Sequence, residues 1–256
     1  MKVSALASGS SGNCFYVENN RSGVLIDAGI SAKKISERLR AIKSNPSKIK
    51  GIFITHEHID HVRGADVFAR KFNIPIFATL GTIKNSFLCS DKSLINVIKN
   101  NETSKISGIE VEAFPKSHSA ADPISYFITA DKKVSIITDL GYICKETINR
   151  ISESDFLFLE SNHDVNMLEN GPYPEFLKSW IKSDKGHLSN KQAGLGVLEH
   201  AKPKIKEIVL SHLSETNNNP QKALSTFNKI LKERKGNSIK LHLSRKDAPT
   251  SLFKVR

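Results

Sequence analysis

Residues 51–61 read GIFITHEHIDH, and this stretch decides the expected fold. The apolar run Gly51–Thr55 predicts a buried strand, and a polar cluster follows it at once. Three histidines and one aspartate stand within six residues, at His56, His58, Asp60 and His61. Loops at the carboxyl ends of strands are where α/β proteins place their sites. The stretch therefore predicts a strand that ends in a functional loop.

The cluster has the residue types and the spacing of a divalent metal site. His56 and His58, two residues apart, can point the same way from extended backbone. Asp60 and His61 continue round the turn, so one short loop can offer ligands to two neighbouring ions. Neutral imidazole and carboxylate are ligands that Zn²⁺, Mn²⁺ and Fe²⁺ accept. A lone histidine is usually a surface or core residue, but this spacing after a buried strand favours metal ligation.

Three later segments repeat the layout of an apolar strand followed by one donor residue. They end at His118 in FPKSH, at Asp139 in SIITD and at His212 in IVLSH. Ligands that are far apart in sequence can converge in this way, because strand ends meet at one edge of a sheet. His200 and His242 lack such a context, and we interpret them as structural.

The remaining pattern alternates short apolar runs with helix-like stretches, which predicts stacked helix and sheet layers in an α/β protein. We predict helices at Val62–Phe72, Asn190–His200 and Pro220–Lys235, with Ser189 and Asn219 as N-caps of the last two. No repeat and no Pro/Gly-rich linker marks a boundary. We therefore expect one domain over residues 1–256.

The bulk composition is that of a soluble globular protein. Of its 256 residues 39% are hydrophobic and 25% are charged, which are ordinary values. The three cysteines are odd in number and widely spaced, which favours reduced thiols in the cytoplasm. No stretch reaches the ~18 apolar residues of a membrane helix, so we expect no membrane association.

The net charge of +12 is unevenly distributed. From Ala201 to Arg256, 13 Lys or Arg stand against 4 Asp or Glu. This excess favours a polyanionic partner, nucleic acid first. A solvated lysine-rich surface explains the charge equally well. The sequence leaves the oligomeric state open.

The H-x-H-x-D-H pattern resembles that of the metallo-β-lactamase superfamily, and the resemblance extends over the whole chain. It implies an α/β fold, the αβ/βα sandwich of two mixed β-sheets flanked by helices. It also implies two divalent metal ions, Zn²⁺ or Mn²⁺ and alternatively Fe²⁺. Asp27, in LIDAG, matches the residue that supports the metal loop, and it could otherwise cap a turn. The implied metal ligands are His56, His58, Asp60, His61, His118, Asp139 and His212.

Later segments are similar to those of phosphodiesterase members of the superfamily. Gly186-His187-Leu188-Ser189 resembles a segment whose histidine faces the scissile phosphate, so His187 is implied as a catalytic residue. A helix-start histidine that bonds its neighbours is the other interpretation. Asp60 is placed to hold a metal-bridging hydroxide and to accept its proton. His163 and Asp164, in FLESNHD, are candidates for positions near the site.

Together with ASGSSGN at residues 7–13 and GPYP at residues 171–174, these segments resemble the YycJ/WalJ group of small bacterial exonuclease-like proteins. The resemblance implies a 5′ DNA exonuclease with a nucleic acid substrate, DNA favoured. Only 20 residues separate His118 from Asp139, and 72 separate Asp139 from His212. Those intervals leave no room for the tRNA-gripping arm of ribonuclease Z or for the cap domain of β-CASP nucleases.

Two alternatives stay open. The same dinuclear site could hydrolyse a small molecule, such as a thioester, a lactone or a cyclic phosphodiester. The chain could also be a non-catalytic regulatory module on this fold. The second alternative is disfavoured because every expected ligand position is filled.

Overall fold

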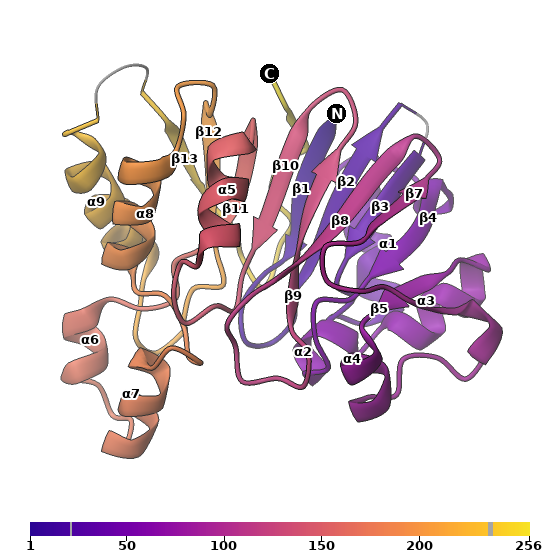
Figure 1. Ribbon diagram of the computed structural model, residues 1–256, viewed down its shortest axis with the longest axis horizontal. Coiled ribbons are helices and arrows are strands. Elements are labelled where there is room, and N and C mark those ends of the chain that lie inside the picture. Colours follow the sequence, from indigo (N-terminus) through magenta and orange to yellow (C-terminus); the bar gives the residue numbers. More distant parts are fainter. Residues whose placement is uncertain (21, 235–237) are drawn as a thin grey trace. The chain divides into compact units, whose positions relative to one another are not determined.

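The computed structural model describes residues 1–20, 22–234 and 238–256 (Figure 1). The chain divides into two compact units. Unit 1 comprises Met1–Pro115, Ala120–Lys132 and Ser244–Val255, and unit 2 comprises Lys116–Ser119, Lys133–Leu243 and Arg256. The described strands form two seven-stranded sheets that each mix parallel and antiparallel pairs. The predicted α/β class with two mixed sheets is confirmed, whereas the single-domain prediction stays a prediction.

Unit 1 contains ten strands and four α-helices among its described residues. The strands are β1 (Lys2–Ala7), β2 (Cys14–Asn19), β3 (Ser22–Ile26), β4 (Ile49–Phe53), β5 (Ile76–Ala78), β6 (Ile95–Val97), β7 (Thr103–Ile106), β8 (Ile109–Pro115), β9 (Ile124–Thr129) and β14 (Phe253–Lys254). The helices are α1 (Ala32–Ala41), α2 (Ile59–Val62), α3 (Ala65–Phe72) and α4 (Leu80–Asn85), with 3₁₀ turns at Pro46–Lys48 and Lys92–Leu94.

The first sheet of unit 1 has the strand order β14-β1-β2-β3-β4-β5-β6. Strands β1 to β3 pair antiparallel and β3 to β6 pair parallel. Strand β9 packs against this sheet, since the Phe53 ring stacks on Phe77 at 4.5 Å and meets the edge of Tyr126 at 5.5 Å. The Tyr126 hydroxyl also donates to the Ile54 carbonyl at 2.9 Å. Aromatic packing and one buried hydrogen bond thus hold β9 over the end of β4, where the histidine-rich loop begins.

Unit 2 contains four strands and five α-helices among its described residues. They are β10 (Lys133–Ile137), α5 (Lys145–Glu153), β11 (Phe156–Glu160), α6 (Val165–Glu169), α7 (Glu175–Lys182), α8 (Asn190–His200), β12 (Glu207–Ser211), α9 (Pro220–Leu231) and β13 (Lys240–Leu243).

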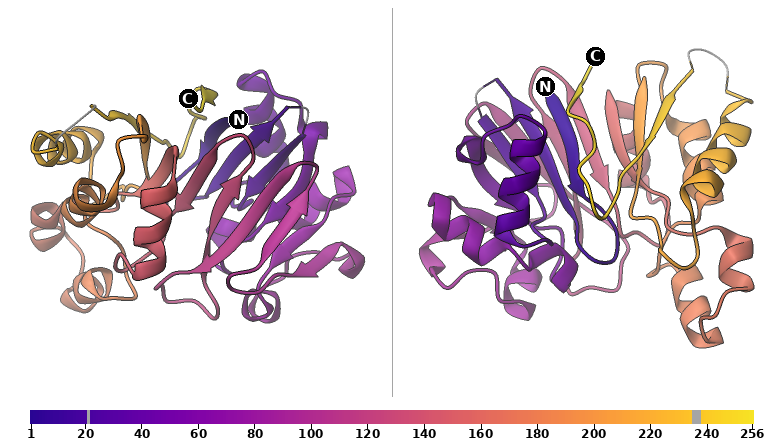
Figure 2. Two further views of the ribbon diagram at one scale, coloured as in Figure 1. Left: turned by 45° about the horizontal axis from the view of Figure 1, so that its top comes forward. Right: turned by 180° about the vertical axis from the view of Figure 1, so that it is seen from behind.

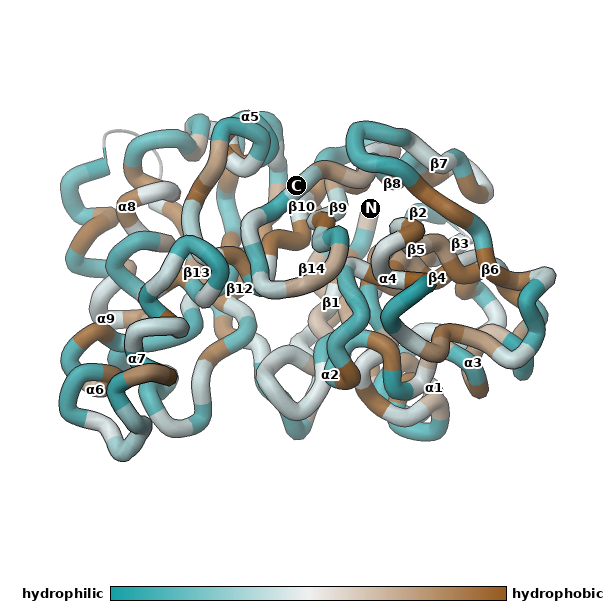
Figure 3. The backbone as a smooth tube through the Cα atoms, turned by 60° about the horizontal axis from the view of Figure 1, so that its bottom comes forward, coloured by the Kyte–Doolittle hydropathy of each residue, from teal (hydrophilic) through white to brown (hydrophobic). Residues whose placement is uncertain are grey.

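The strands of unit 2 run parallel in the order β10-β11-β12-β13, and α5, α8 and α9 lie along them (Figure 1 and Figure 2). Every residue of β11 is buried, as expected of a parallel strand that is covered on both faces. In Figure 3 the helices alternate between hydrophilic and hydrophobic colours, whereas β4 and β5 of unit 1 are hydrophobic. Parallel pairing sets the carboxyl ends of β10, β11 and β12 at one edge of the sheet, where polar residues follow each strand.

Several predicted elements are confirmed. Helix α8 spans Asn190–His200 with Ser189 as its N-cap in a capping box, and Asn219 caps α9. Helix α9 ends at Leu231, earlier than predicted, and the predicted end Lys235 lies outside the described residues.

The helix predicted over Val62–Phe72 is wrong in its continuity, because Gly64 separates α2 from α3. A Cβ at Gly64 would lie 2.1 Å from the Ile30 carbonyl oxygen, and the Gly64 amide donates to the Ala28 carbonyl. A tertiary backbone contact therefore interrupts a helical pattern here.

Among the described residues, no helix combines the length and the apolar character that crossing a bilayer requires.

Candidate metal centre

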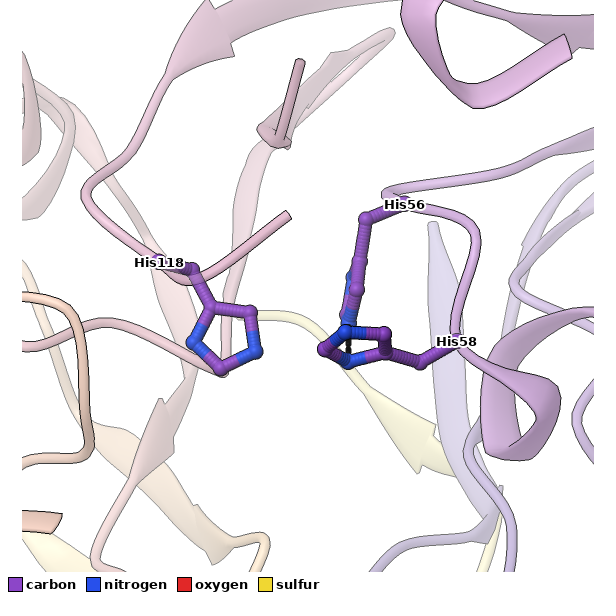
Figure 4. Close-up of side chains that lie close together, drawn as sticks. All are labelled: His56, His58 and His118. Atoms are coloured by element: carbon purple, nitrogen blue, oxygen red, sulfur yellow. Dashed lines mark hydrogen bonds between the residues drawn. The ribbon is translucent and has the colours of Figure 1, made fainter. Parts of the chain in front are cut away.

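The histidine-rich loop of unit 1 leaves the end of β4 and enters α2. His56 and His61 are fully buried, and His58 is the N-cap residue of α2. The Nε2 atom of His56 lies 3.0 Å from Nδ1 of His58, and Figure 4 shows the two rings meeting at a steep angle. Two imidazole nitrogens this close, both on buried or half-buried rings, suit shared ligation of one cation.

Asp27 supports this loop from the end of β3. Its carboxylate is fully buried and accepts the Thr55 amide at 2.8 Å and the Thr55 hydroxyl at 3.0 Å. It also lies 2.7 Å from Nδ1 of His61. A histidine that donates from Nδ1 to a carboxylate presents the lone pair of Nε2, which is the form that binds metals. Asp27 is thus positioned to fix the tautomer and the direction of His61.

Backbone hydrogen bonds join the same loop to the segment after β3 and to the turn before β2. The Ala28 amide donates to the His61 carbonyl at 2.8 Å, and the Asn13 amide donates to the Asp60 carbonyl at 2.7 Å. Gly29 permits this approach, because a Cβ there would lie 1.6 Å from the Asp60 carbonyl oxygen. Any side chain at residue 29 would force the loop away.

Asn13 contributes a side chain to the loop that the sequence did not assign. Its Nδ2 lies 3.2 Å from Oδ2 of Asp60 and 3.1 Å from Nε2 of His61. The side chain is fully buried and its Oδ1 accepts the Gly9 amide. The small-residue turn before β2 therefore carries a residue that touches two candidate ligands.

Unit 2 presents its candidate ligands at the ends of neighbouring parallel strands. Asp139 follows β10 and His212 follows β12, and Nε2 of His212 lies 3.3 Å from Oδ1 of Asp139. Both residues, like Asp27, have φ near +60°. This left-handed conformation is uncommon for residues other than glycine and often marks a functional position.

Glu160, the last residue of β11, lies among these groups, although no motif in the sequence assigned it to the site. Its buried carboxylate accepts the amides of Asp139, Leu140 and Leu188. It also lies 2.9 Å from Nδ1 of His187 and 3.0 Å from Nδ1 of His212. Burial works to raise the pKa of Glu160, but the two histidines outweigh it and hold the pKa at about 2. The carboxylate is charged and orients both rings.

The four groups at this edge form a compact set of donors. One ligand atom from each of Asp139, Glu160, His187 and His212 lies within 4.8 Å of the others. The His187 ring is 5.2 Å from that of His212 and 5.3 Å from that of His118. His187 therefore lies among the candidate ligands of unit 2.

His118 ends the segment after β8. Its Nδ1 lies 3.3 Å from the Gly186 carbonyl oxygen, which fixes Nδ1 as the donor. Burial lowers the pKa of His118 to about 3, so the ring is neutral near pH 7, as a metal ligand must be. The loop of His118 is tied to the loop that carries His187, because the Ser119 amide donates to the Lys185 carbonyl.

His163 and Asp164, the two residues expected near the site, have different surroundings. His163 is buried after β11, its carbonyl accepts the Asn190 amide, and burial lowers its pKa to about 4. Asp164 caps α6 by accepting the Met167 amide at 3.0 Å. Asp164 thus has a structural function of its own. Nε2 of His242, a residue interpreted as structural, lies 2.8 Å from Oε2 of Glu207.

The structure thus brings the predicted residues together in two sets. Within unit 1 lie Asp27, His56, His58, Asp60 and His61, and within unit 2 lie His118, Asp139, His187 and His212. In each set a buried carboxylate holds a histidine by Nδ1, and Nε2 of that ring lies 3.3 Å from a second carboxylate, Asp60 for His61 and Asp139 for His212. Imidazoles in this form and carboxylates are the donors that divalent transition-metal ions take.

This fold and these donors define a class of protein. Residues 23–213 match the beta-lactamase superfamily domain, and the chain belongs to the metallo-β-lactamase superfamily. It is a metal-dependent hydrolase. The fold also occurs in the metallo-β-lactamase fold protein YhfI of Bacillus subtilis, with a TM-score of 0.72 and 14% identity over 97% of this chain and 98% of that one.

Within the superfamily, the chain is similar to two curated proteins. It is 39% identical over 223 residues to exodeoxyribonuclease WalJ of Streptococcus pneumoniae, covering 85% of this chain and 83% of the relative. It is 35% identical over 263 residues to exodeoxyribonuclease YycJ of Bacillus anthracis, covering 98% of both. The expected resemblance to the metallo-β-lactamase superfamily and to the YycJ/WalJ group is confirmed.

Proposed function

We propose that this protein is a nuclease that removes nucleotides from the 5′ end of DNA. The observation that carries the proposal is the similarity to exodeoxyribonucleases at 35–39% identity over most of the chain. The net charge of +12 adds support, because nucleic acid is a polyanion. Cys14, Cys89 and Cys144 form no disulfide, which fits a cytoplasmic enzyme of this kind.

We propose further that the two sets of donors hold two divalent ions in the manner of the superfamily. The proposed ligands are His56, His58, Asp60, His61, His118, Asp139 and His212. Support comes from His61, His118 and His212, whose Nδ1 atoms each lie within 3.3 Å of an acceptor oxygen. Bound divalent ions lower the pKa of water towards neutrality and polarise the scissile phosphodiester.

The side chains of the chain then have distinct tasks. Asp60 accepts the proton of the attacking water. His187, held by charged Glu160, donates a hydrogen bond from Nε2 to the phosphate as negative charge develops there. Glu160 fixes the direction of the His187 ring, since its Oε1 lies 2.9 Å from Nδ1. Asp27 and Glu160 act through the histidines that they orient.

The test is incubation of the purified protein with an oligonucleotide in Mn²⁺ or Zn²⁺. A 5′ label is expected to be released as a mononucleotide, while a 3′ label stays on fragments that shorten progressively. A panel of thioesters, lactones and cyclic phosphodiesters serves as the comparison and is expected to remain intact. Intact DNA with either ion, or rapid turnover of a member of the panel, would contradict the proposal.

Two substitutions separate ligation from catalysis. Asp60→Ala is expected to lose turnover and bound metal together, because it removes a ligand. His187→Ala is expected to retain its metal and to lose about 100-fold in kcat, a typical effect of removing one donor to a developing charge. Full activity of His187→Ala on DNA would remove this residue from the mechanism.

A further inference from the structure

A cavity in unit 2 adjoins the chain segment that carries His187. Its volume is about 360 Å³, which is within the range of small-molecule sites. Aliphatic side chains form part of its lining, and the polar part consists of His163, Lys182, Ser189, Lys191 and Gln192. Ser189 is two residues after His187, so chain geometry keeps their Cα atoms within ~7 Å of each other. A ligand in this cavity therefore contacts the same short segment that carries the candidate catalytic histidine.

The charge of the lining favours an anion. Two of its side chains are lysines, and no carboxylate is among the lining residues that the structure describes. The carboxylates that follow in the sequence have partners of their own. Asp164 accepts the Met167 amide, and Glu169 pairs with Lys182 at 2.6 Å. Neither of these contacts offsets the positive charge of Lys191.

The amino-terminal end of helix α8 adds to this positive character. The helix has eleven residues, Ser189 is its N-cap, and its first turn contains no acidic residue. The Gln192 amide donates to Oγ of Ser189 at 3.2 Å, and the Asn190 amide donates to the His163 carbonyl at 2.8 Å. The start of a helix carries the positive end of its dipole and favours phosphate groups. A helix start alone does not define a site, so the side chains around it decide.

His163 supplies an independent indication of a ligand. It lines the cavity and is only 2% exposed. Its Nδ1 is buried and has no hydrogen-bond partner within the described part of the chain. Buried polar atoms in proteins are nearly always paired, because an unpaired one destabilises the fold. Burial lowers the pKa of His163 to about 4, so the ring is neutral near pH 7 and keeps one N–H to donate.

We propose that this cavity binds a phosphate monoester, with the side chains of Lys191 and His163 as its partners. The inference rests on the proposed function and deepens it. A DNA strand presents such a group as its 5′-terminal phosphate, and a nucleoside monophosphate released by the reaction presents the same group. Recognition of a terminal phosphate beside His187 explains removal of nucleotides from an end of the strand. The tests below separate the strand end from the free nucleotide.

The first test measures binding and not turnover. Inorganic phosphate is titrated by calorimetry into the metal-loaded wild-type protein and into Lys191→Gln. Because bound metal ions also attract phosphate, the difference between the two proteins isolates the cavity. We expect one binding step to weaken by about 5-fold in Lys191→Gln, the value of one hydrogen bond. Identical titrations of the two proteins would overturn the inference.

Lys33→Gln is the matched control for this titration. Lys33 is the second residue of α1, as Lys191 is of α8, and both helices have a serine N-cap. Both lysines are exposed. The control removes the same charge from the same helical position in unit 1, and we expect the affinity for phosphate to stay unchanged. An equal loss in Lys33→Gln would assign the effect to net charge and overturn the inference.

The second test identifies the source of the phosphate. Two duplexes that differ only in a 5′ phosphate or a 5′ hydroxyl are digested by the wild-type protein and by Lys191→Gln. If the strand end is the source, the wild-type protein prefers the 5′ phosphate by about 5-fold in kcat/KM, and Lys191→Gln loses the preference. If the free nucleotide is the source, both duplexes are cut alike, and thymidine 5′-monophosphate inhibits the wild-type protein more strongly than Lys191→Gln. Neither effect would refute the site.

Substitutions of His163 test the second partner. His163→Asn keeps a polar group near the place of Nδ1, whereas His163→Leu removes it. We expect His163→Leu to lose more affinity for inorganic phosphate than His163→Asn, and equal affinities in all three proteins would remove His163 from the site. If His163→Leu fails to fold, Lys191→Gln decides the inference, because an exposed lysine tolerates replacement.

Failure of the site and failure of the proposed function give different results. If the wild-type protein cleaves DNA but Lys191→Gln matches it in both tests, the phosphate site fails and the proposed function stands. If the wild-type protein cleaves no DNA, the proposed function fails, and the titration with inorganic phosphate decides the site on its own.

Discussion

Two buried carboxylates orient the histidines of the two donor sets, and they accept different numbers of hydrogen bonds. Asp27 in unit 1 receives one backbone amide, one hydroxyl and one histidine. Glu160 in unit 2 receives three backbone amides and two histidines. Each carboxylate stands at the end of a central strand, fully buried. A buried charge of this kind is tolerated only when several donors surround it.

The two units differ in whether backbone contacts or a carboxylate supply most of the support for the loop. Around Asp27 the backbone contributes much of the support, through Gly29 and the amides of Asn13 and Ala28. Around Glu160 the carboxylate itself ties together the ends of β10 and β12 and the loop before α8. We therefore expect unit 1 to be most sensitive to changes in backbone space, and unit 2 to the loss of one charge.

Gly29→Ala is expected to have the largest effect. The new methyl group would overlap the Asp60 carbonyl and approach the Asn13 amide, and both are backbone atoms. Overpacking of this kind costs about 3 kcal/mol or more. We expect a large loss of thermal stability and no retained metal. Gly108→Ala is the comparison, since a Cβ there meets nothing within 4 Å and only the left-handed backbone, with a φ of +80°, is strained, at a cost of about 1–2 kcal/mol. Equal melting temperatures for the two variants would refute the steric account.

Glu160→Gln is expected to come next. The amide cannot accept all five hydrogen bonds, so donors are left buried and unpaired, at a cost of about 3 kcal/mol. Because two histidines lose their orientation, kcat on DNA should fall by more than the ~10- to 100-fold typical of one supporting residue. Glu207→Gln is the matched control, because Glu207 also pairs with a histidine, His242. Similar kinetics for the two variants would show that Glu160 has no special function.

Asp27→Asn tests the same principle with one histidine in place of two. Loss of the carboxylate weakens the hold on His61, and we expect metal affinity to fall by about 10- to 100-fold. Competition with a chelator measures this affinity. Asp66→Asn is the control, since Asp66 also accepts a backbone amide, from Ser90, but lies outside the donor set. A larger loss of metal affinity in Asp27→Asn than in Glu160→Gln would reverse the comparison.

Asn13→Ala is expected to have the smallest effect. It removes the contacts to Asp60 and His61 but leaves the Asn13 amide in place. The loss of about 1 kcal/mol corresponds to roughly a 5-fold weaker metal affinity. The same chelator competition measures it. No change at all would assign the side chain to the turn alone, through its contact with the Gly9 amide.

Much of the fold could be predicted because its signals are local. The continuous apolar run of Phe156–Glu160 is a strand signal in the sequence itself, and β11 has those bounds. Helix α8 matches because a capping box and a regular pattern define it. Strands β6 and β14 have three and two residues, too few for a periodic pattern, and were not predicted. Helix α5 was also missed, because only Thr147 and Ile151 of its nine residues are buried.

The candidate site also contains residues that the sequence could predict and residues that it could not. The residues of the histidine-rich loop stand together in the sequence and could be named from it. Glu160 could not, because its partners lie 20 to 52 residues away and only folding brings them to it. Asn13 is similar, since its contacts with Asp60 and His61 span 47 and 48 residues. A carboxylate that ends a fully apolar strand is the signal that could have pointed to Glu160.

The most direct test of the central claim is the metal content of the purified protein, measured by mass spectrometry after dialysis against Zn²⁺ or Mn²⁺. We expect two ions per chain. We also expect a lower ratio in His58→Ala, which alters the donor set of unit 1, and in His212→Ala, which alters that of unit 2. A wild-type protein that binds no ion, or variants that both still bind two, would contradict the claim.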